Sequence, residues 1–170
     1  MIIFISGPPG AGKTTLALAY LAQVARGLHL PIDDLRTWVV SGLADAVPWT
    51  EETERQFQIA ERAACAVART YSDAGFTIAI DHCRNPQRLD ELIQSELDGY
   101  EVLKVLLLPD LEVNLARNAT RTNKPFDPAV LTETIRFTNE TYRKDIPPGW
   151  KVVDNSDLTI AQTLSAFTPM

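Results

Sequence analysis

The sequence predicts an α/β protein: one domain, residues 1–170, built on a five-stranded parallel sheet that is doubly wound, with helices on both faces. Short apolar runs rich in β-branched residues alternate with helical patterns along the chain. The first strand and the first helix are joined by a glycine-rich loop. The length of 170 residues suits one domain with a full-sized core. No internal repeat or linker divides the chain.

The first elements frame the glycine loop. Residues 1–5 form a short apolar run, as expected of a buried parallel strand. A segment rich in Ala and Leu then predicts a helix over about 13–26. Residues 28–32 predict a short second strand. Asp33 and Asp34 follow this strand, and we expect them to cap a helix that reaches about Ser41.

The middle of the chain predicts a long helix and another buried strand. The helix is expected over 50–75, because acidic side chains open it, an apolar stripe runs along it and a glycine follows it. Residues 76–80 predict a strand that ends at Asp81. The next helix is expected up to about Leu97, with Asn85 as its N-cap and proline in its first turn.

The last third repeats the alternation. Its expected elements are a strand over 101–108, a helix from about 111, a helix that ends near 145, a strand over 150–154 and a final helix capped by Ser156 and Asp157. Arg117 and Arg121 lie four residues apart and therefore share a helix face. A cluster of helix-breaking residues follows them at 123–128.

The glycine loop carries the most specific pattern in the chain. It matches G-x-x-x-x-G-K-[ST] at every position, through Gly7, Pro8, Pro9, Gly10, Ala11, Gly12, Lys13 and Thr14. In this pattern the glycines let backbone N–H groups point at phosphate oxygens, the lysine reaches the β- and γ-phosphates, and the hydroxyl holds Mg²⁺. We therefore predict that ATP·Mg²⁺ binds along residues 7–15, Thr15 included. The alternative is a glycine- and proline-rich turn without a ligand, but such a turn would not require Lys13 and Thr14 at its end.

Polar residues gather where the predicted strands end, which is where open α/β sheets bind ligands. Asp33-Asp34 follow the second strand, Asp81-His82-Cys83-Arg84 the third, and Asp154-Asn155 the fifth. His82 has no metal-ligand partner in the pattern, and we leave it open between lining a substrate pocket and supporting the structure.

The net charge, the cysteine spacing and the apolar runs of the sequence argue against several classes of function. The net charge of −6 argues against a broad nucleic-acid surface. Cys65 and Cys83 lie far apart and show no metal spacing. No apolar run is long enough for a membrane span, and the start lacks the basic region of a signal peptide. We therefore expect a cytoplasmic protein with no membrane partner and no nucleic-acid partner.

The chain resembles the small P-loop phosphotransferases, a group that includes chloramphenicol phosphotransferase, zeta toxins, gluconate kinase, shikimate kinase and adenylylsulfate kinase. The resemblance covers nearly the whole chain in element order. It rests on five segments: residues 7–14, 32–36, 78–81, the Arg117/Arg121 pair and 153–156. Only the first is highly specific.

The resemblance implies roles for residues that follow the strands. In the family, an aspartate after the second strand orients or deprotonates the acceptor hydroxyl. Pro31 replaces the first aspartate of the Asp-x-Asp seen in several relatives, so both Asp33 and Asp34 are candidates here. Asp33 is preferred because it lies nearer the end of the strand, and Asp34 is the alternative. Asp81 would hold Mg²⁺ through water, beside Thr14. Arg36 and Arg84 are candidates for contacting the substrate.

The resemblance also implies a short lid around residues 117–127. Its arginines, Arg117 and Arg121, would clamp the transferred phosphoryl group and stabilise its charge. Asn155 would lie in the loop on the adenine side of the nucleotide.

The sequence thus predicts a kinase that moves the γ-phosphate of ATP to a hydroxyl of a small molecule. A nucleoside or polynucleotide kinase is one alternative. An ATP-binding switch module with little turnover is another. The acceptor itself and the oligomeric state are not predicted.

Overall fold

The computed structural model describes residues 1–120 and 127–167, and it confirms the predicted parallel sheet. The strands are β1 (Ile2–Ser6), β2 (Gly27–Pro31), β3 (Thr77–His82), β4 (Val102–Leu107) and β5 (Trp150–Val153). They are all parallel and lie in the order β2-β3-β1-β4-β5. The central strand β1 is wholly buried, which explains its unbroken apolar sequence.

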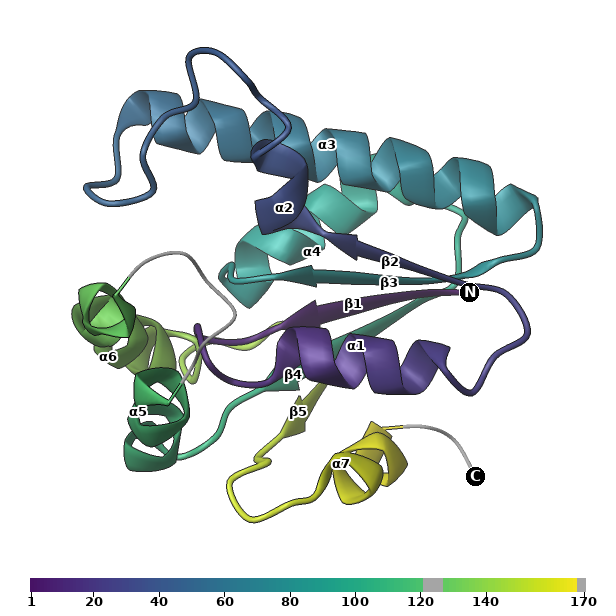
Figure 1. Cartoon of the computed structure of the whole chain (residues 1–170). Helices are drawn as coiled ribbons and strands as arrows, with labels where there is room; N and C mark the ends of the chain where they lie inside the picture. The colour runs from purple at the N-terminus through teal and green to yellow at the C-terminus, as the bar shows by residue number, and fades with distance from the viewer. Residues whose placement is uncertain (121–126, 168–170) are drawn as a thin grey trace.

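Helices cover both faces of the sheet, and the carboxyl ends of the strands point to one side (Figure 1). The helices are α1 (Lys13–Leu21), α2 (Ile32–Arg36), α3 (Glu51–Asp73), α4 (Pro86–Glu96), α5 (Leu111–Ala119), α6 (Thr132–Thr141) and α7 (Ile160–Phe167), with a 3-10 turn η1 (Pro128–Leu131) before α6. In Figure 1, α3 and α4 lie on one face and α1 and α7 on the other. The start of α3 and helices α5 and α6 lie on the side of the strand ends.

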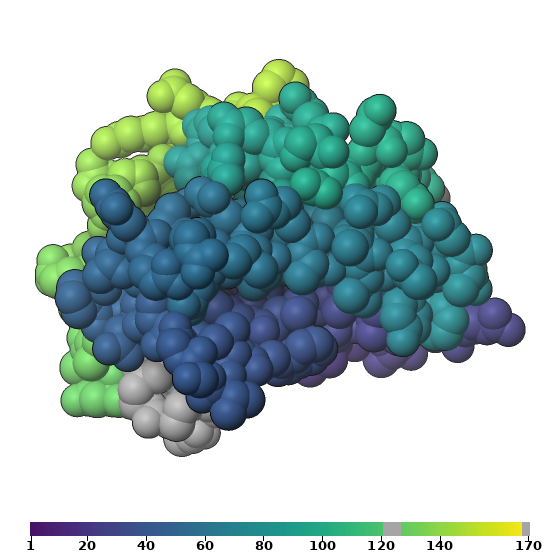
Figure 2. Space-filling model, turned by 90° about the horizontal axis from the view of Figure 1, so that it is seen from above, coloured from purple at the N-terminus to yellow at the C-terminus, as the bar shows by residue number. Residues whose placement is uncertain are grey.

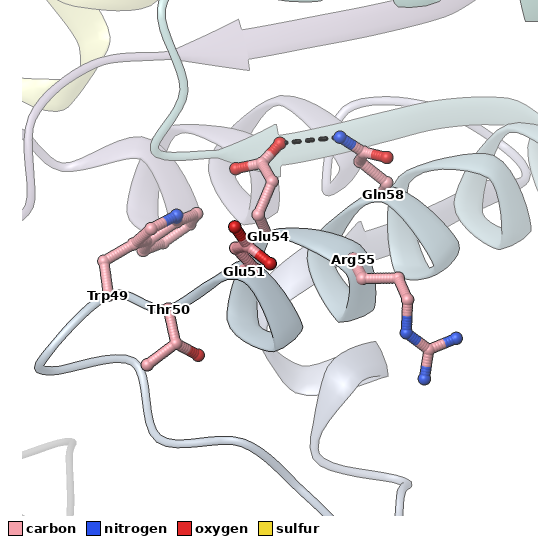
Figure 3. A pocket seen from close by; sticks show the side chains of 6 residues that line it. All are labelled: Trp49, Thr50, Glu51, Glu54, Arg55 and Gln58. Carbon is pink, nitrogen blue, oxygen red and sulfur yellow. Dashed lines mark hydrogen bonds between the residues drawn. The ribbon is translucent and has the colours of Figure 1, made fainter.

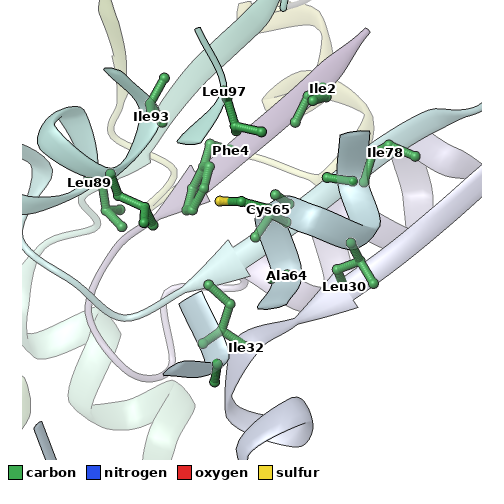
Figure 4. Packing of buried hydrophobic residues seen from close by; sticks show 14 of the residues in the cluster. Ile2, Phe4, Leu30, Ile32, Ala64, Cys65, Ile78, Leu89, Ile93 and Leu97 are labelled. Atoms are coloured by element: carbon green, nitrogen blue, oxygen red, sulfur yellow. The ribbon is translucent and has the colours of Figure 1, made fainter. Parts of the chain in front are cut away.

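Two apolar cores lie on the two faces of the sheet. Under α3 and α4, alternate side chains of β1, Ile2 and Phe4, pack with Cys65, Leu89 and their neighbours (Figure 4). Ile3 and Ile5 point the other way into a core with α1 and α7. This period-two alternation is what a strand buried on both faces requires. It fixes the register that brings Ser6, Asp81 and His82 to the carboxyl edge.

The long helix α3 is preceded by a surface segment, residues 37–50. Thr50 caps the helix: its hydroxyl accepts from the Thr53 backbone N–H at 3.1 Å, and the Thr53 side chain in turn accepts from the Thr50 N–H. The Thr53 hydroxyl also donates to the Asp45 carbonyl at 2.7 Å, which ties the segment to the helix. Figure 2 shows the segment in dark blue on the surface beside α3. Several apolar side chains in it are exposed, Trp38 and Val40 among them.

Three helix boundaries predicted from the sequence are wrong. Helix α1 ends at Leu21 rather than near residue 26, since the chain must turn before β2 begins at Gly27. The helix at Asp33-Asp34 ends at Arg36 rather than near Ser41, and both aspartates lie in its first turn rather than at its N-cap. The β-branched residues Thr37, Val39 and Val40 and the glycine Gly42, which follow the helix, are poor helix formers.

The final helix starts later than expected. Ser156 does not cap it, because its hydroxyl pairs with the Asp154 carboxylate and accepts the Asp110 N–H. Helix α7 begins at Ile160 instead. Thr159 and Gln162 exchange side-chain and backbone hydrogen bonds there, which satisfies the first N–H groups of the helix.

Candidate active site

The glycine loop has the backbone conformation that its sequence predicts. Gly7, Gly10 and Gly12 all have positive φ angles of 150°, 81° and 97°. A Cβ at Gly7 would lie 2.5 Å from the Leu107 carbonyl oxygen, so the loop can pass β4 only as glycine. The loop therefore fits an anion cradle at the start of α1, where the helix dipole adds positive potential.

Lys13 lies inside this cradle. Its ammonium donates to the carbonyls of Gly7 and Pro8, each at 2.9 Å. The loop's own carbonyls therefore hold the cation of Lys13 in the absence of a ligand.

A cavity of about 310 Å³ opens beside the loop. Gly10, Gly12 and Thr15 line one side of it, and Arg117 and Asn155 line the other, together with apolar residues of the β5–α7 connection. The Asn155 side-chain amide donates to the Ala11 carbonyl at 3.0 Å, and Arg117 donates to the Asn155 carbonyl at 2.8 Å. The planar guanidinium of Arg117 and the apolar side chains of Leu158 and Ile160 suit a flat, uncharged group that lies next to the glycine loop.

Asp81 lies at the end of β3, where Lys13 and Thr14, which follow the glycine loop, affect the pKa of its carboxyl. Burial would raise the pKa of its carboxyl, but a 2.6 Å contact with His29 Nε2 and the charge of Lys13 outweigh it and hold the pKa below its ordinary value. The Thr14 hydroxyl contributes in the same direction. A hydroxyl and an ionised carboxylate beside a phosphate cradle are the donors that Mg²⁺ takes when water and phosphate fill its remaining positions, so these residues fit the ion. Among the described residues, no group of three or more metal-ligating side chains comes together.

Asp33 and Lys13 both act electrostatically on one buried group, the thiol of Cys83. Both charges act on the pKa of the Cys83 thiol, which burial raises. The Cys83 sulfur also lies 3.8 Å from the hydroxyl of Tyr142, a phenol whose pKa burial raises well above its usual range. The Asp33 side chain is 53% exposed and is therefore accessible from solvent. Asp34, the alternative, is on the same short helix.

Next to Asp33 lies a buried pair of polar side chains, His82 and Glu61. His82 Nδ1 is 3.8 Å from Asp33 Oδ1, and its Nε2 is 3.1 Å from Glu61 Oε1. The side chains of His82 and Glu61 are only 2% and 1% exposed. Phe57 packs on the imidazole with ring centroids 5.5 Å apart.

Arg84 extends this cluster toward the surface. Both terminal nitrogens of its guanidinium donate to the carboxylate of Glu54. Its Nε also forms an ion pair with Glu61, 3.0 Å from Oε1. Burial works against its charge, yet the two carboxylates outweigh that effect and raise the pKa of Arg84. Its guanidinium also lies over the ring of Trp49, 5.5 Å from the ring centroid. Arg84 is therefore already neutralised by partners.

A second cavity, of about 500 Å³, lies at the start of α3 (Figure 3). Trp49, Glu51, Glu54 and Gln58 are among its lining residues. Glu54 accepts a hydrogen bond from Gln58 across it, as the dashed line in Figure 3 marks. Its charged walls are mostly carboxylates.

Arg36 does not face a binding space. The residue is only 8% exposed, donates to the Ala44 carbonyl at 2.5 Å and lies over the Phe57 ring at 4.5 Å. It holds the surface segment 37–50 in place, and the expected contact with substrate does not fit this position. The predicted site residue Arg121 and most of the predicted lid, residues 121–126, lie outside the described residues.

Sequence reasoning missed Glu61, Tyr142 and His29 as site residues. A signal for Glu61 was present: it falls on the same helical stripe as Phe57 and Ala64, where a carboxylate is out of place without a partner. Its partner His82 was singled out, but nothing local in the sequence joins positions 61 and 82.

The sheet order, the glycine loop after β1 and the polar strand ends define a class, the P-loop kinase fold. Within that class the chain belongs to the family of chloramphenicol phosphotransferase-like proteins. The model of this family matches residues 1–164. Family membership supports a small-molecule phosphotransferase. None of the curated proteins matches the chain by sequence.

Solved structures agree on the fold. A sugar kinase from Janibacter sp. HTCC2649 superposes with a TM-score of 0.73 at 18% identity, covering 96% of this chain and 90% of its own. The tunicamycin resistance protein of Deinococcus radiodurans gives 0.70 at 17% identity, with 98% and 92% covered. A gluconokinase from Sinorhizobium meliloti 1021 gives 0.66 at 17% identity, with 96% and 87% covered. In the part of the chain that is described, no helix is both long and apolar enough to cross a membrane.

Proposed function

We propose that the protein is an ATP-dependent kinase that transfers the γ-phosphate to a hydroxyl of a small molecule. One observation carries the proposal: the glycine loop after β1 is intact and holds Lys13, and a half-exposed carboxylate, Asp33, follows β2 at the same carboxyl edge of the parallel sheet. The loop and Lys13 bind the triphosphate. Asp33 orients the acceptor hydroxyl and takes its proton as the oxygen attacks phosphorus. Asp34 is the alternative residue for that step.

The remaining residues fit the two ends of the nucleotide. Thr14 and Asp81 would hold Mg²⁺, which when bound neutralises charge on the β- and γ-phosphates. Arg117 and Asn155 would hold the base or ribose, since they line the cavity beside the loop. This role differs from the phosphoryl clamp expected for Arg117 from the sequence. The clamp role of Arg121 stays a prediction.

The acceptor we propose is uncharged or cationic rather than anionic. Arg84 is paired with Glu54 and Glu61, and Arg36 is buried against Phe57. Neither of these cations is available to a phosphate or carboxylate of the acceptor. The charged residues that line the cavity near Trp49 are Glu51, Glu54 and Arg55, and the Arg55 guanidinium is paired with Glu52. This arrangement disfavours a nucleotide or polynucleotide acceptor.

The test compares Asp33→Asn with Asp34→Asn, two matched changes in the same turn of α2. We expect Asp33→Asn to lower kcat by about 10²–10⁴-fold, the usual contribution of a general base, with little change in ATP affinity. Phosphoryl transfer from ATP·Mg²⁺ is measured over a panel of neutral, cationic and phosphorylated alcohols. Loss of activity only in Asp34→Asn would move the base by one residue. Full activity in both variants would contradict the proposed mechanism.

A further inference from the structure

We propose that Asn114 and Asn155 are positioning residues, each of which holds one peptide of the glycine loop so that its N–H group stays directed at bound phosphate. The inference rests on the proposed function, in which this loop binds the triphosphate of ATP. Asn114 lies on α5, and Asn155 lies in the connection between β5 and α7. Both side chains therefore reach the loop from outside the β1–α1 unit that contains it.

Each asparagine donates to one carbonyl of the loop. The side-chain amide of Asn114 donates to the Pro9 carbonyl at 2.8 Å, and that of Asn155 donates to the Ala11 carbonyl at 3.0 Å. Asn114 is fully buried and Asn155 is 7% exposed. The Oδ1 atoms of both amides have no hydrogen-bond partner among the described residues. In this part of the chain, each side-chain amide therefore makes its hydrogen bond to the loop alone.

These two bonds set the direction of two N–H groups. The peptides Pro9–Gly10 and Ala11–Gly12 are trans, and in a planar trans peptide the C=O and the N–H point in opposite directions. Because each carbonyl is held against an asparagine, the N–H of the next residue points away from that asparagine. Among the described residues, no backbone carbonyl accepts from the Gly10 or the Gly12 N–H. Both groups are left to bind an anion.

The same two peptides can turn over easily unless they are held. Rotation of a peptide by half a turn changes ψ of the residue before it and φ of the residue after it. The residues after these peptides are Gly10 and Gly12, with φ of 81° and 97°, and glycine adopts both signs of φ. A turned peptide would present its carbonyl oxygen to phosphate in place of its N–H. A donor fixed on each carbonyl opposes this rotation.

A third buried asparagine provides a matched comparison. Asn118 lies one turn after Asn114 on α5, is 3% exposed and donates to the Pro128 carbonyl at 2.7 Å. Its Oδ1 also has no hydrogen-bond partner among the described residues. Asn118 therefore matches Asn114 in burial and in the kind of bond, but its bond goes to η1 instead of the glycine loop.

The test measures the affinity for inorganic tripolyphosphate by calorimetry, because this probe carries the phosphate chain without the base. We expect Asn114→Ala and Asn155→Ala each to weaken binding about 3–10-fold, the equivalent of the one hydrogen bond that holds the peptide. Asn118→Ala is the control. We expect it to lower the melting temperature about as much as Asn114→Ala and to leave the affinity unchanged.

The outcomes separate this inference from the proposed function. Wild-type affinity in Asn114→Ala and Asn155→Ala, with binding lost in Lys13→Ala, would overturn this inference alone. Equal weakening in Asn114→Ala and Asn118→Ala would also overturn it, since a general loss of stability would then account for the effect. If neither tripolyphosphate nor ATP·Mg²⁺ binds to the wild-type protein, the proposed function and this inference fail together.

A measurement without ligand tests the peptide directions themselves. Nuclear Overhauser effects between the Hα of Pro9 or Ala11 and the amide proton of the next residue differ between the two orientations of each peptide. We expect the wild-type protein to show only the orientation described here. The second orientation should appear at Gly10 in Asn114→Ala and at Gly12 in Asn155→Ala. Turned peptides in the wild-type protein, or no response to either substitution, would overturn the inference.

Discussion

Lys13 shows how one side chain can be placed before its ligand arrives. Its ammonium is held at 2.9 Å from two carbonyls of the loop that we propose binds phosphate. The residue contributes little to either apolar core. Function and stability can therefore be separated at this position.

We predict that Lys13→Ala nearly abolishes phosphoryl transfer and leaves the fold intact. The reason is that Lys13 supplies the cation that the β- and γ-phosphates need. Turnover and the free energy of unfolding are measured side by side, with the exposed Lys144→Ala as the control for removing one positive charge. A folded Lys13→Ala protein with normal turnover would remove the central role of the loop.

Arg117 is the residue for which the structure changes the expectation most. It is anchored to the carbonyls of Asn155 and Ser156 and lines the cavity beside the loop. We predict that Arg117→Ala weakens ATP binding more than it lowers kcat, because its contacts form in the ground state as well as in the transition state. Titration of ATP by calorimetry and a kcat measurement separate the two. A lower kcat at unchanged affinity would restore the clamp role.

At the scale of elements, helix α3 carries one wall of the site. Its first turns supply Glu54 and Phe57, and its buried stripe supplies Glu61. The position of this wall depends on how the helix begins. The reciprocal cap between Thr50 and Thr53 fixes that start and also holds Asp45.

We predict that Thr50→Ala lowers the free energy of unfolding by about 1 kcal/mol, the typical cost of losing an N-cap. Chemical denaturation measures it. Thr70→Ala is the matched control, since the hydroxyl of that exposed threonine donates to the Ala66 carbonyl of its own helix. Equal losses in the two variants would mean that the cap does not anchor the helix.

Elements also mark the limit of what could be predicted from the sequence. The glycine loop and the strands were predictable because their signals are local: consecutive glycines, and short apolar runs. The start of α7 depends on side-chain bonds such as that between Ser156 and Asp154, which cannot be predicted from the sequence pattern. The Asp33–His82–Glu61 cluster was not predictable, because it joins three distant positions that only the folded sheet brings together.

At the scale of the whole molecule, ion pairs tie the separate walls of the site together. Arg84, in the β3–α4 connection, binds Glu54 and Glu61 of α3, and Ser6 of β1 donates to the Arg84 carbonyl at 2.6 Å. Hydrogen bonds from Arg84 lower the pKa of Glu54 below its ordinary value of 4.5. A carboxyl with a depressed pKa in the folded state stabilises the protein at neutral pH. That stabilisation is lost as pH falls below about 4.5 toward the folded value.

We predict that Glu54→Gln lowers the free energy of unfolding at pH 7 by about 1–2 kcal/mol and flattens its decline on acidification. Glu140→Gln is the control: its pKa is also lowered, by the hydrogen bond from Lys144, but that pair is exposed and lies within one helix. We expect no measurable change for it. Denaturant unfolding at pH 7 and pH 3 gives both quantities. An unaltered acid decline in Glu54→Gln would show that the Arg84 pair does not hold the walls together.

The central claim is that this chain moves a phosphoryl group from ATP to an alcohol. ³¹P NMR of ATP·Mg²⁺ with the panel of alcohols follows the phosphorus itself, in wild-type protein and in Lys13→Ala and Asp33→Asn. We predict that the wild-type γ-phosphate signal is replaced by that of a new phosphomonoester together with ADP, and that both variants leave ATP unchanged. Release of inorganic phosphate alone, or intact ATP with every neutral and cationic alcohol tested, would contradict the account.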